Sequence, residues 1–406
     1  SDLPVMILAH TVMGKGISFM ENQAKYHGST LSIDQYEMAM KEMGQCNDFD
    51  TYKVKRIESA KSAQISHLKT GQSLFKLEPG KPILYEAEND CRSAWGNAIT
   101  ELGRINFGKE NPIVVVDCDL ASSVKTSDFR KELPNMFLQS GIMEHHAAVM
   151  GGAISTCGVQ CFWSDFGVFG IDETYNMQRL NDINHTNLKT ILTHVGIDVG
   201  EDGKTHQCID YISLTRNLFD TKIVCPADAN HTDRIIRWLI DKPGNYIVAM
   251  GRSKLPILKT PEGEIHFGLD YCFNYGIADV LRIGNQGTVF VCGTPAARTL
   301  RAIDSLREEG IFLQLVYVSC PLDLDQSIIE EAATKGVIFT IEDHSIHGGL
   351  GTSVAEMLVR LQLRVKLVKI GLDGYPVSGA SDDLFKMAGM DTISLVNRFR
   401  SEIDNV

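Results

Sequence analysis

The feature that most constrains this chain is a regular alternation of apolar runs and helical patterns that begins near Asp90. Residues 113–116 form a short continuous apolar run of the kind found in strands buried on both faces. One face of a predicted helix precedes that run, with apolar residues at i, i+3, i+4 and i+7: Trp95, Ala98, Ile99 and Leu102. The alternation continues to about Met250, and it predicts parallel sheets covered by helices, the α/β class.

A second alternating block starts near Gly287. TVFVCG reads as a strand, residues 296–307 as a helix, and FLQLVYV and VIFTIEDH as further strands. A chain of 406 residues is long enough for two or three domains. We therefore expect two consecutive domains with mainly parallel sheets at 89–255 and 256–406. They follow an N-terminal region at 1–45 and a polar connecting segment at 46–88, which has few periodic signals.

Composition excludes several classes of protein. The hydrophobic content of 44% and the charged content of 22% are typical of a globular protein, and the formal charge of −12 with no basic cluster argues against a nucleic-acid partner. No apolar run approaches the ~18 residues that a membrane span needs, and the start SDLPVMILAH lacks the pattern of a secretory signal. Ten cysteines without a CxxC pair indicate reduced thiols, so we expect a cytoplasmic location and neither a disulfide framework nor a zinc site.

The loop GEDGKTHQ, residues 200–207, follows the strand-like run 190–194. Ligands of α/β proteins bind at the carboxyl ends of strands, where this loop is expected to lie. Glu201, Asp202 and His206 can hydrogen-bond a polyhydroxylated substrate, and His206 can also move protons near neutral pH. The alternative interpretation is a solvated turn.

Five segments in this order resemble the later two-thirds of a transketolase: TVMGKGISFMEN…KYHG, GIMEHH, THVGIDVGEDGKTHQ, MGRSKLP and TIEDHSIHGGLG. Transketolases are dimeric thiamine-diphosphate enzymes with a diphosphate-binding, a pyrimidine-binding and a C-terminal domain. The resemblance implies that residues 1–45 are the tail of the first of these domains. It also implies that 89–255 is the pyrimidine-binding domain and 256–406 the C-terminal domain.

The resemblance implies that Glu144, in GIMEHH, is the catalytic acid. Thiamine catalysis needs a protonated carboxyl group that stabilises the imino tautomer of the cofactor's aminopyrimidine, and a glutamate in an apolar place can supply one. The alternative is an acid that complements the dipole at a helix N-terminus. A metal site built from Glu144, His145 and His146 is disfavoured, because consecutive helical residues point in different directions.

The cofactor's ring also needs an apolar face. Phe166 and Phe169, in FWSDFGVFG, match the family's aromatic pair, although phenylalanines at this spacing most often belong to a core. Asp119, in the loop DLASS, resembles a family aspartate near the cofactor, and capping of the next element is nearly as good an account.

Substrate contacts are implied in the same way. Four residues occupy the family's positions around a sugar phosphate: Arg92, Ser123, His194 and Arg252. Cationic and hydroxyl donors of this kind suit a phosphate dianion. Any one of the four could instead be a surface residue or a structural donor, which is the interpretation that Arg92 taken alone favours, and it is the set of four that predicts a phosphosugar. Asp202 resembles the residue that reads a donor hydroxyl. His206 resembles one that contacts the reacting hydroxyl and carbonyl, and His27 a histidine of the same reaction centre. His344 and His347 are interpreted mainly as packing residues, with a contact between domains or a regulatory role as the alternative.

One departure from the family concerns its diphosphate and magnesium site. No Gly-Asp-Gly occurs in the 406 residues, so we expect the Mg²⁺ ligands to lie outside this chain. Either the chain is a fragment or a second polypeptide carries that domain, and the opening at SDLPVMILAH favours truncation. We therefore expect a homodimer or an assembly with an N-terminal domain or subunit. A smaller departure is Met13, where some transketolases have a basic residue.

The predicted function is thiamine-diphosphate-dependent transfer of a two-carbon ketol unit from a ketose phosphate to an aldose phosphate. The alternatives are a deoxyxylulose-phosphate synthase, a β-subunit of a 2-oxoacid dehydrogenase, and a non-catalytic assembly partner. The Glu201–Asp202 pair and the four phosphate-site residues favour transketolase over the two enzymes. The presence of Glu144 argues against a silent partner.

Overall fold

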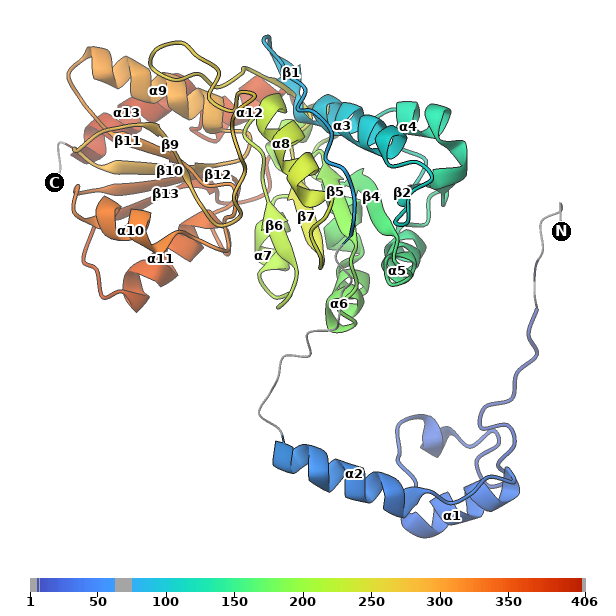
Figure 1. The fold of residues 1–406 in the computed structure, drawn as a ribbon. Helices are drawn as coiled ribbons and strands as arrows, with labels where there is room; N and C mark the ends of the chain where they lie inside the picture. Colours follow the sequence, from blue (N-terminus) through green and yellow to red (C-terminus); the bar gives the residue numbers. More distant parts are fainter. Residues whose placement is uncertain (1–5, 7, 63–74, 404–406) are drawn as a thin grey trace. The chain divides into compact units, whose positions relative to one another are not determined.

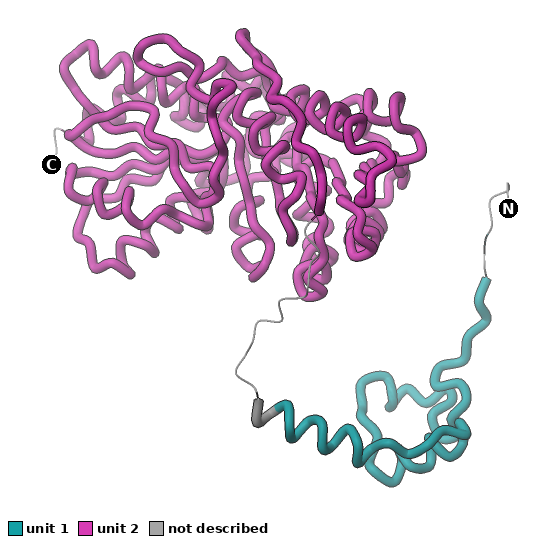
Figure 2. The backbone as a smooth tube through the Cα atoms, viewed as in Figure 1, with its two compact units in different colours: residues 1–70 teal, residues 71–406 magenta. Residues whose placement is uncertain are grey.

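The computed structural model of the chain describes residue 6, residues 8–62 and residues 75–403. The chain divides into two units, residues 1–70 and residues 71–406, which are described separately (Figure 2). The second unit carries the predicted architecture: two mainly parallel sheets with helices on their faces (Figure 1).

The first unit is helical in its described part. It contains the 3₁₀ helix η1 (Ala24–His27) and the helices α1 (Ile33–Glu42) and α2 (Phe49–Ser62). A reciprocal capping box between Ser32 and Gln35 fixes the start of α1. Helix α2 falls in the segment predicted as a polar connection. Tyr52, Val54 and Ile57 of this helix are exposed, and Phe49 is half-buried beside Tyr36. These apolar residues do not form one stripe at helical spacing, so the sequence gives only a weak periodic signal. Residues 63–74 of that segment lie outside the described residues.

The first sheet of the second unit has six parallel strands in the order β3-β2-β4-β5-β7-β6. These strands are β2 (Ile113–Asp117), β3 (Phe137–Gln139), β4 (Gln160–Phe166), β5 (Lys189–Thr193), β6 (Lys222–Val224) and β7 (Tyr246–Ala249). The helices of this part are α3 (Cys91–Ile105), α4 (Ser127–Glu132), η2 (Pro134–Met136), α5 (Glu144–Ser155), η3 (Val168–Glu173), α6 (Tyr175–Ile183), η4 (Ile197–Asp202), α7 (Tyr211–Thr215) and α8 (Ala229–Leu239). A short antiparallel pair, β1 (Asn89–Asp90) with β8 (Lys254–Leu255), joins the start of this part to its end.

Helix α3 shows why the sequence pattern predicts this layer. Asp90 caps the helix by accepting a hydrogen bond from the Ser93 N–H, and the predicted apolar face is fully buried. Trp95 on that face lies 5.5 Å, ring centroid to centroid, from Phe162 of β4. Truncating a buried aromatic of this kind costs about 3–5 kcal/mol of the free energy of unfolding.

The second sheet has five strands in the order β13-β12-β10-β11-β9, and the edge strand β9 is antiparallel to β11. Its strands are β9 (Asp279–Arg282), β10 (Thr288–Cys292), β11 (Gln314–Tyr317), β12 (Ile338–Ser345) and β13 (Leu367–Leu372). Its helices are α9 (Ala296–Glu308), α10 (Gln326–Ala333), α11 (Leu350–Arg360), α12 (Ser381–Met387) and α13 (Thr392–Ile403). The predicted strands at TVFVCG, FLQLVYV and VIFTIEDH and the predicted helix at 296–307 are confirmed.

The two sheets share a hydrophobic core. One buried cluster contains Leu192 and Ile247 of the first sheet together with Phe290 and Val316 of the second. The Tyr317 hydroxyl also donates a hydrogen bond to the Cys225 carbonyl at 2.7 Å. The second sheet therefore packs directly on the first. Within the described parts of the chain, no helix combines the length and apolar character needed to cross a membrane.

Candidate active site

The candidate site lies at the carboxyl ends of four neighbouring parallel strands, β2, β4, β5 and β7. Asp119 follows β2, Phe166 ends β4, His194 follows β5 and Arg252 follows β7. Phe166 pairs with Thr193 across the sheet, which places the next residue of β5, His194, beside the Phe166 ring. The topology thus brings together residues that are up to 133 positions apart in the sequence.

Glu144 is the first residue of α5 and is 8% exposed. Its carboxyl group, the Cys118 thiol and the Asp165 carboxyl group lie within 4.8 Å of one another. No described residue forms a hydrogen bond or an ion pair with the Glu144 carboxyl group. The position at the start of a helix also agrees with the alternative interpretation, since a helix N-terminus favours a negative charge. Its burial beside a second acid is not explained by that alternative.

Aromatic rings line the site beside β4 and β5. The Phe166 and Phe169 rings are stacked with centroids 6.0 Å apart, so the predicted pair is brought together. His194 covers one face of Phe166 at 3.8 Å, and His206 approaches Phe169 edge-on at 5.5 Å. The pair is therefore part of a larger aromatic wall that includes two histidines.

Arg92 connects the other three residues predicted around the phosphate. Its guanidinium donates hydrogen bonds to the main-chain carbonyls of Ser123 at 2.9 Å and Arg252 at 2.7 Å, and it lies 3.4 Å from Nε2 of His194. Burial, with the nearby charge of Arg252, lowers the pKa of Arg92 from its usual value. These contacts fix the loops after β2 and β7, which agrees with the alternative interpretation of Arg92 as a structural donor.

His194 is almost fully buried. Burial, reinforced by the charges of Arg92 and Arg252, lowers its pKa to about 2, so the ring is neutral at physiological pH. His194 also has a positive φ of 57°, and Asp119 has one of 64°. Such backbone angles are costly for residues other than glycine and cluster at functional sites. Asp119 is exposed and caps no described helix, since the next helix, α4, has Thr126 at its N-cap.

The GEDG loop begins inside the helix η4 (Ile197–Asp202), and residues near both sheets hold this helix by hydrogen bonds. Asp198 accepts the backbone N–H groups of Arg252 at 2.6 Å and Ser253 at 2.7 Å. Asp343 of β12 accepts the N–H of Ile197 at 2.9 Å. Asp202 itself is exposed at the end of η4, where it is available to a ligand.

Sequence reasoning missed Asp165, Asp198 and Asp343. Asp165 had a visible signal: it is an acid in the otherwise buried strand QCFWSDF, where an unpaired charge is costly. Asp198 and Asp343 gave no comparable signal, because their partners are distant in the sequence.

His27 lies in the first unit, at the end of η1, and is exposed.

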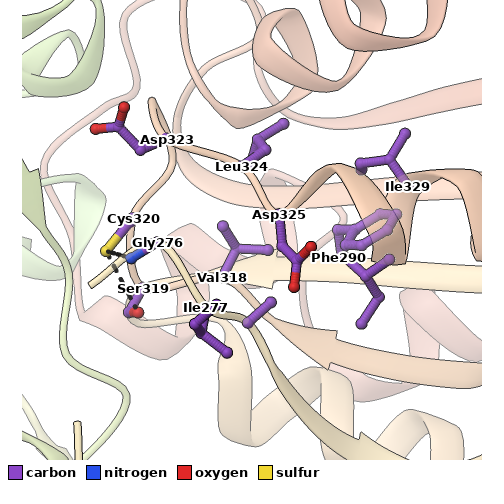
Figure 3. Close-up of a pocket in the computed structure, with 12 residues that line it drawn as sticks. Gly276, Ile277, Phe290, Val318, Ser319, Cys320, Asp323, Leu324, Asp325 and Ile329 are labelled. Carbon is purple, nitrogen blue, oxygen red and sulfur yellow. Dashed lines mark hydrogen bonds between the residues drawn. The ribbon is translucent and has the colours of Figure 1, made fainter. Parts of the chain in front are cut away.

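A separate small cavity lies in the C-terminal part, beside β10 and β11 (Figure 3). Its volume is about 10 Å³, and its lining includes Phe290, Val318 and Cys320. The Cys320 sulfur accepts the Gly276 N–H at 3.3 Å. A cavity of this size holds about one water molecule, so it does not compete with the strand-end site as a place for a substrate.

Family models match both parts of the second unit. Residues 88–257 match the pyrimidine-binding domain of transketolase, and residues 276–395 match the transketolase C-terminal domain. A putative transketolase C-terminal section from Methanocaldococcus jannaschii is 33% identical over 314 residues, which cover 77% of this chain and 96% of that protein.

The chain belongs to the transketolase family. A further relative is one subunit of the apulose-4-phosphate transketolase of Phocaeicola vulgatus, 29% identical over 74% of this chain and 93% of that subunit. A solved split-gene transketolase, described as an inactive β4 tetramer, matches with a TM-score of 0.68 and 30% identity over 78% of this chain and 98% of that one. The chain spans 60–64% of the length of the transketolase and transketolase-like relatives from mammals.

Transketolases are in general dependent on thiamine diphosphate, and the described residues fit one half of that cofactor. A buried acid without a partner lies within the same strand-end site as an aromatic wall, as the pyrimidine half requires. The diphosphate half is different, because Mg²⁺ prefers ligand sets made only of oxygen. Among the described residues, both three-residue clusters of possible metal ligands contain a thiol, from Cys118 or Cys208. Neither cluster suits Mg²⁺.

Proposed function

We propose that this chain supplies the pyrimidine-binding and C-terminal parts of an enzyme that transfers a two-carbon ketol unit from a ketose phosphate to an aldose phosphate. The observation that carries the proposal is the position of Glu144. It is a buried acid with no described partner, at the strand-end edge of the sheet that also carries the aromatic wall.

The cofactor contacts follow from this arrangement. Phe166 and Phe169 would pack against the aminopyrimidine of thiamine diphosphate, Glu144 would exchange a proton with that ring, and Asp119 would lie near the cofactor. The bound cofactor supplies a nucleophilic carbanion at its thiazolium carbon. The neighbouring aromatic side chains exclude water, which strengthens the interaction of Glu144 with the ring.

The substrate contacts use the network around Arg92. Arg252 has a 39% exposed side chain, so its charge can reach a substrate phosphate from the rim of the site. His194 would act as a neutral hydrogen-bonding group, and the Ser123 hydroxyl would complete the phosphate site. Asp202 and His206 would contact the hydroxyl groups of the sugar, and His27 would join them at the reaction centre.

The chain would act in an assembly. Two relatives are named as a transketolase subunit and as a split-gene transketolase, and neither of the two three-residue ligand clusters among the described residues consists of oxygen ligands alone. We therefore assign the diphosphate and its Mg²⁺ to a separate diphosphate-binding domain or subunit. A homodimer of such assemblies is the expected form of the enzyme.

A second candidate function is that of a partner without activity of its own. The solved split-gene relative is an inactive tetramer of β chains, which favours this function for the chain in isolation. The two candidates differ in the assembled state, where only the first predicts that Glu144 is required for turnover.

The test is a ketol-transfer assay with xylulose and ribose phosphates. It uses this chain together with a polypeptide that carries the diphosphate-binding domain, thiamine diphosphate and Mg²⁺. Glu144→Gln should leave folding intact and lower kcat at least ~100-fold, because a proton-transferring group contributes about that factor. Glu309→Gln, at an exposed ion pair with Arg400, is the matched control and should behave as wild type. Turnover of Glu144→Gln at the wild-type rate would refute the assignment.

A further inference from the structure

A second acid lies behind Glu144, in the strand β4. Asp165 is completely buried, and every residue of that strand is buried with it. Its Oδ1 accepts the backbone N–H of Phe166 at 2.8 Å, whereas its Oδ2 has no hydrogen-bond partner. A buried carboxyl oxygen without a donor is costly if the group is charged, so this position needs an explanation.

The surroundings of Asp165 contain other acids and no described cation in contact. Asp117 is the last residue of β2, Cys118 is in the loop that follows it, and Glu144 comes from α5. The carboxyl groups of Glu144 and Asp165 and the Cys118 thiol lie within 4.8 Å of one another. Both oxygens of Asp117 are already used, by the Leu120 N–H and the Gln139 amide on one and by the Thr126 hydroxyl on the other.

Two carboxyl groups this close in a buried place do not both ionise, because each negative charge opposes the other. Burial raises the pKa of Asp165 to about 8, although hydrogen bonds from the Phe166 N–H and the Cys118 thiol oppose this rise. The charges of Glu144 and Asp117 add to the effect of burial. Glu144 is slightly exposed and stands at the N-terminus of α5, where a negative charge is favoured. At neutral pH Asp165 is therefore protonated.

We propose that Asp165 is a positioning residue for Glu144, and that the two carboxyl groups hold a single proton between them. Asp165 retains the proton in the fully buried strand β4 and keeps it available to Glu144, which is 8% exposed. The role in turnover rests on the proposed function, since it matters only if Glu144 exchanges a proton with a ligand. The shared proton itself is a property of this chain alone.

The first experiment measures the stability of the 406-residue chain against pH by denaturant unfolding. Because the pKa of Asp165 is higher in the folded than in the unfolded chain, its contribution to stability is complete below about pH 4 and is lost as the pH rises to about 8. Over this window it increases the unfolding constant by up to about tenfold per pH unit. Asp165→Asn should remove this component. Glu309→Gln, at the exposed ion pair with Arg400, should keep it.

A second variant keeps the test decisive if Asp165→Asn does not fold. Glu144→Gln removes the neighbouring charge, so the same component of stability should shift to lower pH. In infrared difference spectra, the band of a protonated carboxyl group at pH 7 should disappear in Asp165→Asn and move in Glu144→Gln. It should stay unchanged in Glu309→Gln. A wild-type pH slope in Asp165→Asn, or a band that Glu144→Gln does not move, would overturn the proposal.

In the assembled enzyme, Asp165→Asn should lower kcat about tenfold and shift its pH profile, with KM for the sugar phosphates unchanged. Absence of ketol transfer by the wild-type assembly would refute the proposed function. It would leave the shared proton to be decided by the stability and infrared measurements.

Discussion

The two sheets of this protein have the same kind of architecture but use the polar residues at their strand ends differently. In the second sheet, the last residues of β12 are taken up by backbone hydrogen bonds. Glu342 accepts the N–H groups of Leu350 at 2.6 Å and Gly351 at 2.9 Å. His344 accepts those of Ile212 at 3.2 Å and Ser213 at 3.3 Å, so it makes the contact between domains that was its alternative interpretation.

Near the strand ends of the first sheet, two carboxyl groups keep oxygen atoms without a hydrogen bond. Within the described residues, the Glu144 carboxyl group has no hydrogen-bond partner, and Oδ2 of Asp165 is unpaired. The comparison teaches that an acid at the end of a parallel strand is not by itself a sign of catalysis. What separates the two cases is whether the backbone of neighbouring segments already satisfies the group.

The second sheet still affects the site, because it holds the GEDG loop in place. Asp343 of β12 accepts a hydrogen bond from the N–H of Ile197, at the start of η4, and Ser381 donates a hydrogen bond to Asp198 at 2.8 Å. Gly196 has a φ of 71°, and a Cβ at this position would lie 2.1 Å from Oδ2 of Asp343. Only glycine allows so close an approach.

The largest expected effect comes from removing an acid that the backbone already satisfies, and it falls on the stability of the fold. Glu342→Ala should lower the free energy of unfolding by about 2–4 kcal/mol, because two backbone N–H groups at the buried start of α11 lose their acceptor. Denaturant unfolding of the chain measures this change. Glu309→Ala, at an exposed ion pair, should stay within about 0.5 kcal/mol of wild type. A similar loss in both variants would show that the buried contacts of Glu342 are not special.

A smaller effect is expected from a substitution at the strand ends of the first sheet, and it falls on the KM for substrates. Arg252→Ala should raise KM for phosphorylated substrates about 10- to 100-fold, the value of one or two charge-assisted hydrogen bonds. KM for hydroxypyruvate, which carries no phosphate, should change little. Arg104→Ala, at an exposed ion pair with Glu132, is the control. Equal changes for both kinds of substrate would remove Arg252 from the phosphate site.

Much of the fold could be predicted because periodicity reports burial directly. The apolar face of α3 and the apolar runs of β2 and β10 correspond to buried residues, with the exception of the half-buried Val114 in β2. The gathering of Asp119, Phe166, His194 and Arg252 also follows from topology, since parallel strands end at one edge. Helix α2 was not predicted because its apolar residues form no stripe at helical spacing, and Tyr52, Val54 and Ile57 among them are exposed.

The remaining features depend on contacts between distant segments. The hydrogen bond from Ile197 to Asp343 joins residues 146 positions apart, and no local sequence pattern indicates it. Arg92 was expected to bind phosphate, yet two of its donors are used by main-chain carbonyls. Both cases concern which partner satisfies a polar group, and that is decided by the packing of the two sheets.

The central claim is that this chain supplies the acid and the aromatic wall for thiamine diphosphate, while the diphosphate and Mg²⁺ are bound elsewhere. Isothermal calorimetry of residues 1–406 with thiamine diphosphate and Mg²⁺ tests it most directly, first alone and then with a polypeptide carrying the diphosphate-binding domain. The account predicts weak binding by the chain alone and Mg²⁺-dependent binding by the mixture. Micromolar or tighter binding by the chain alone would contradict it.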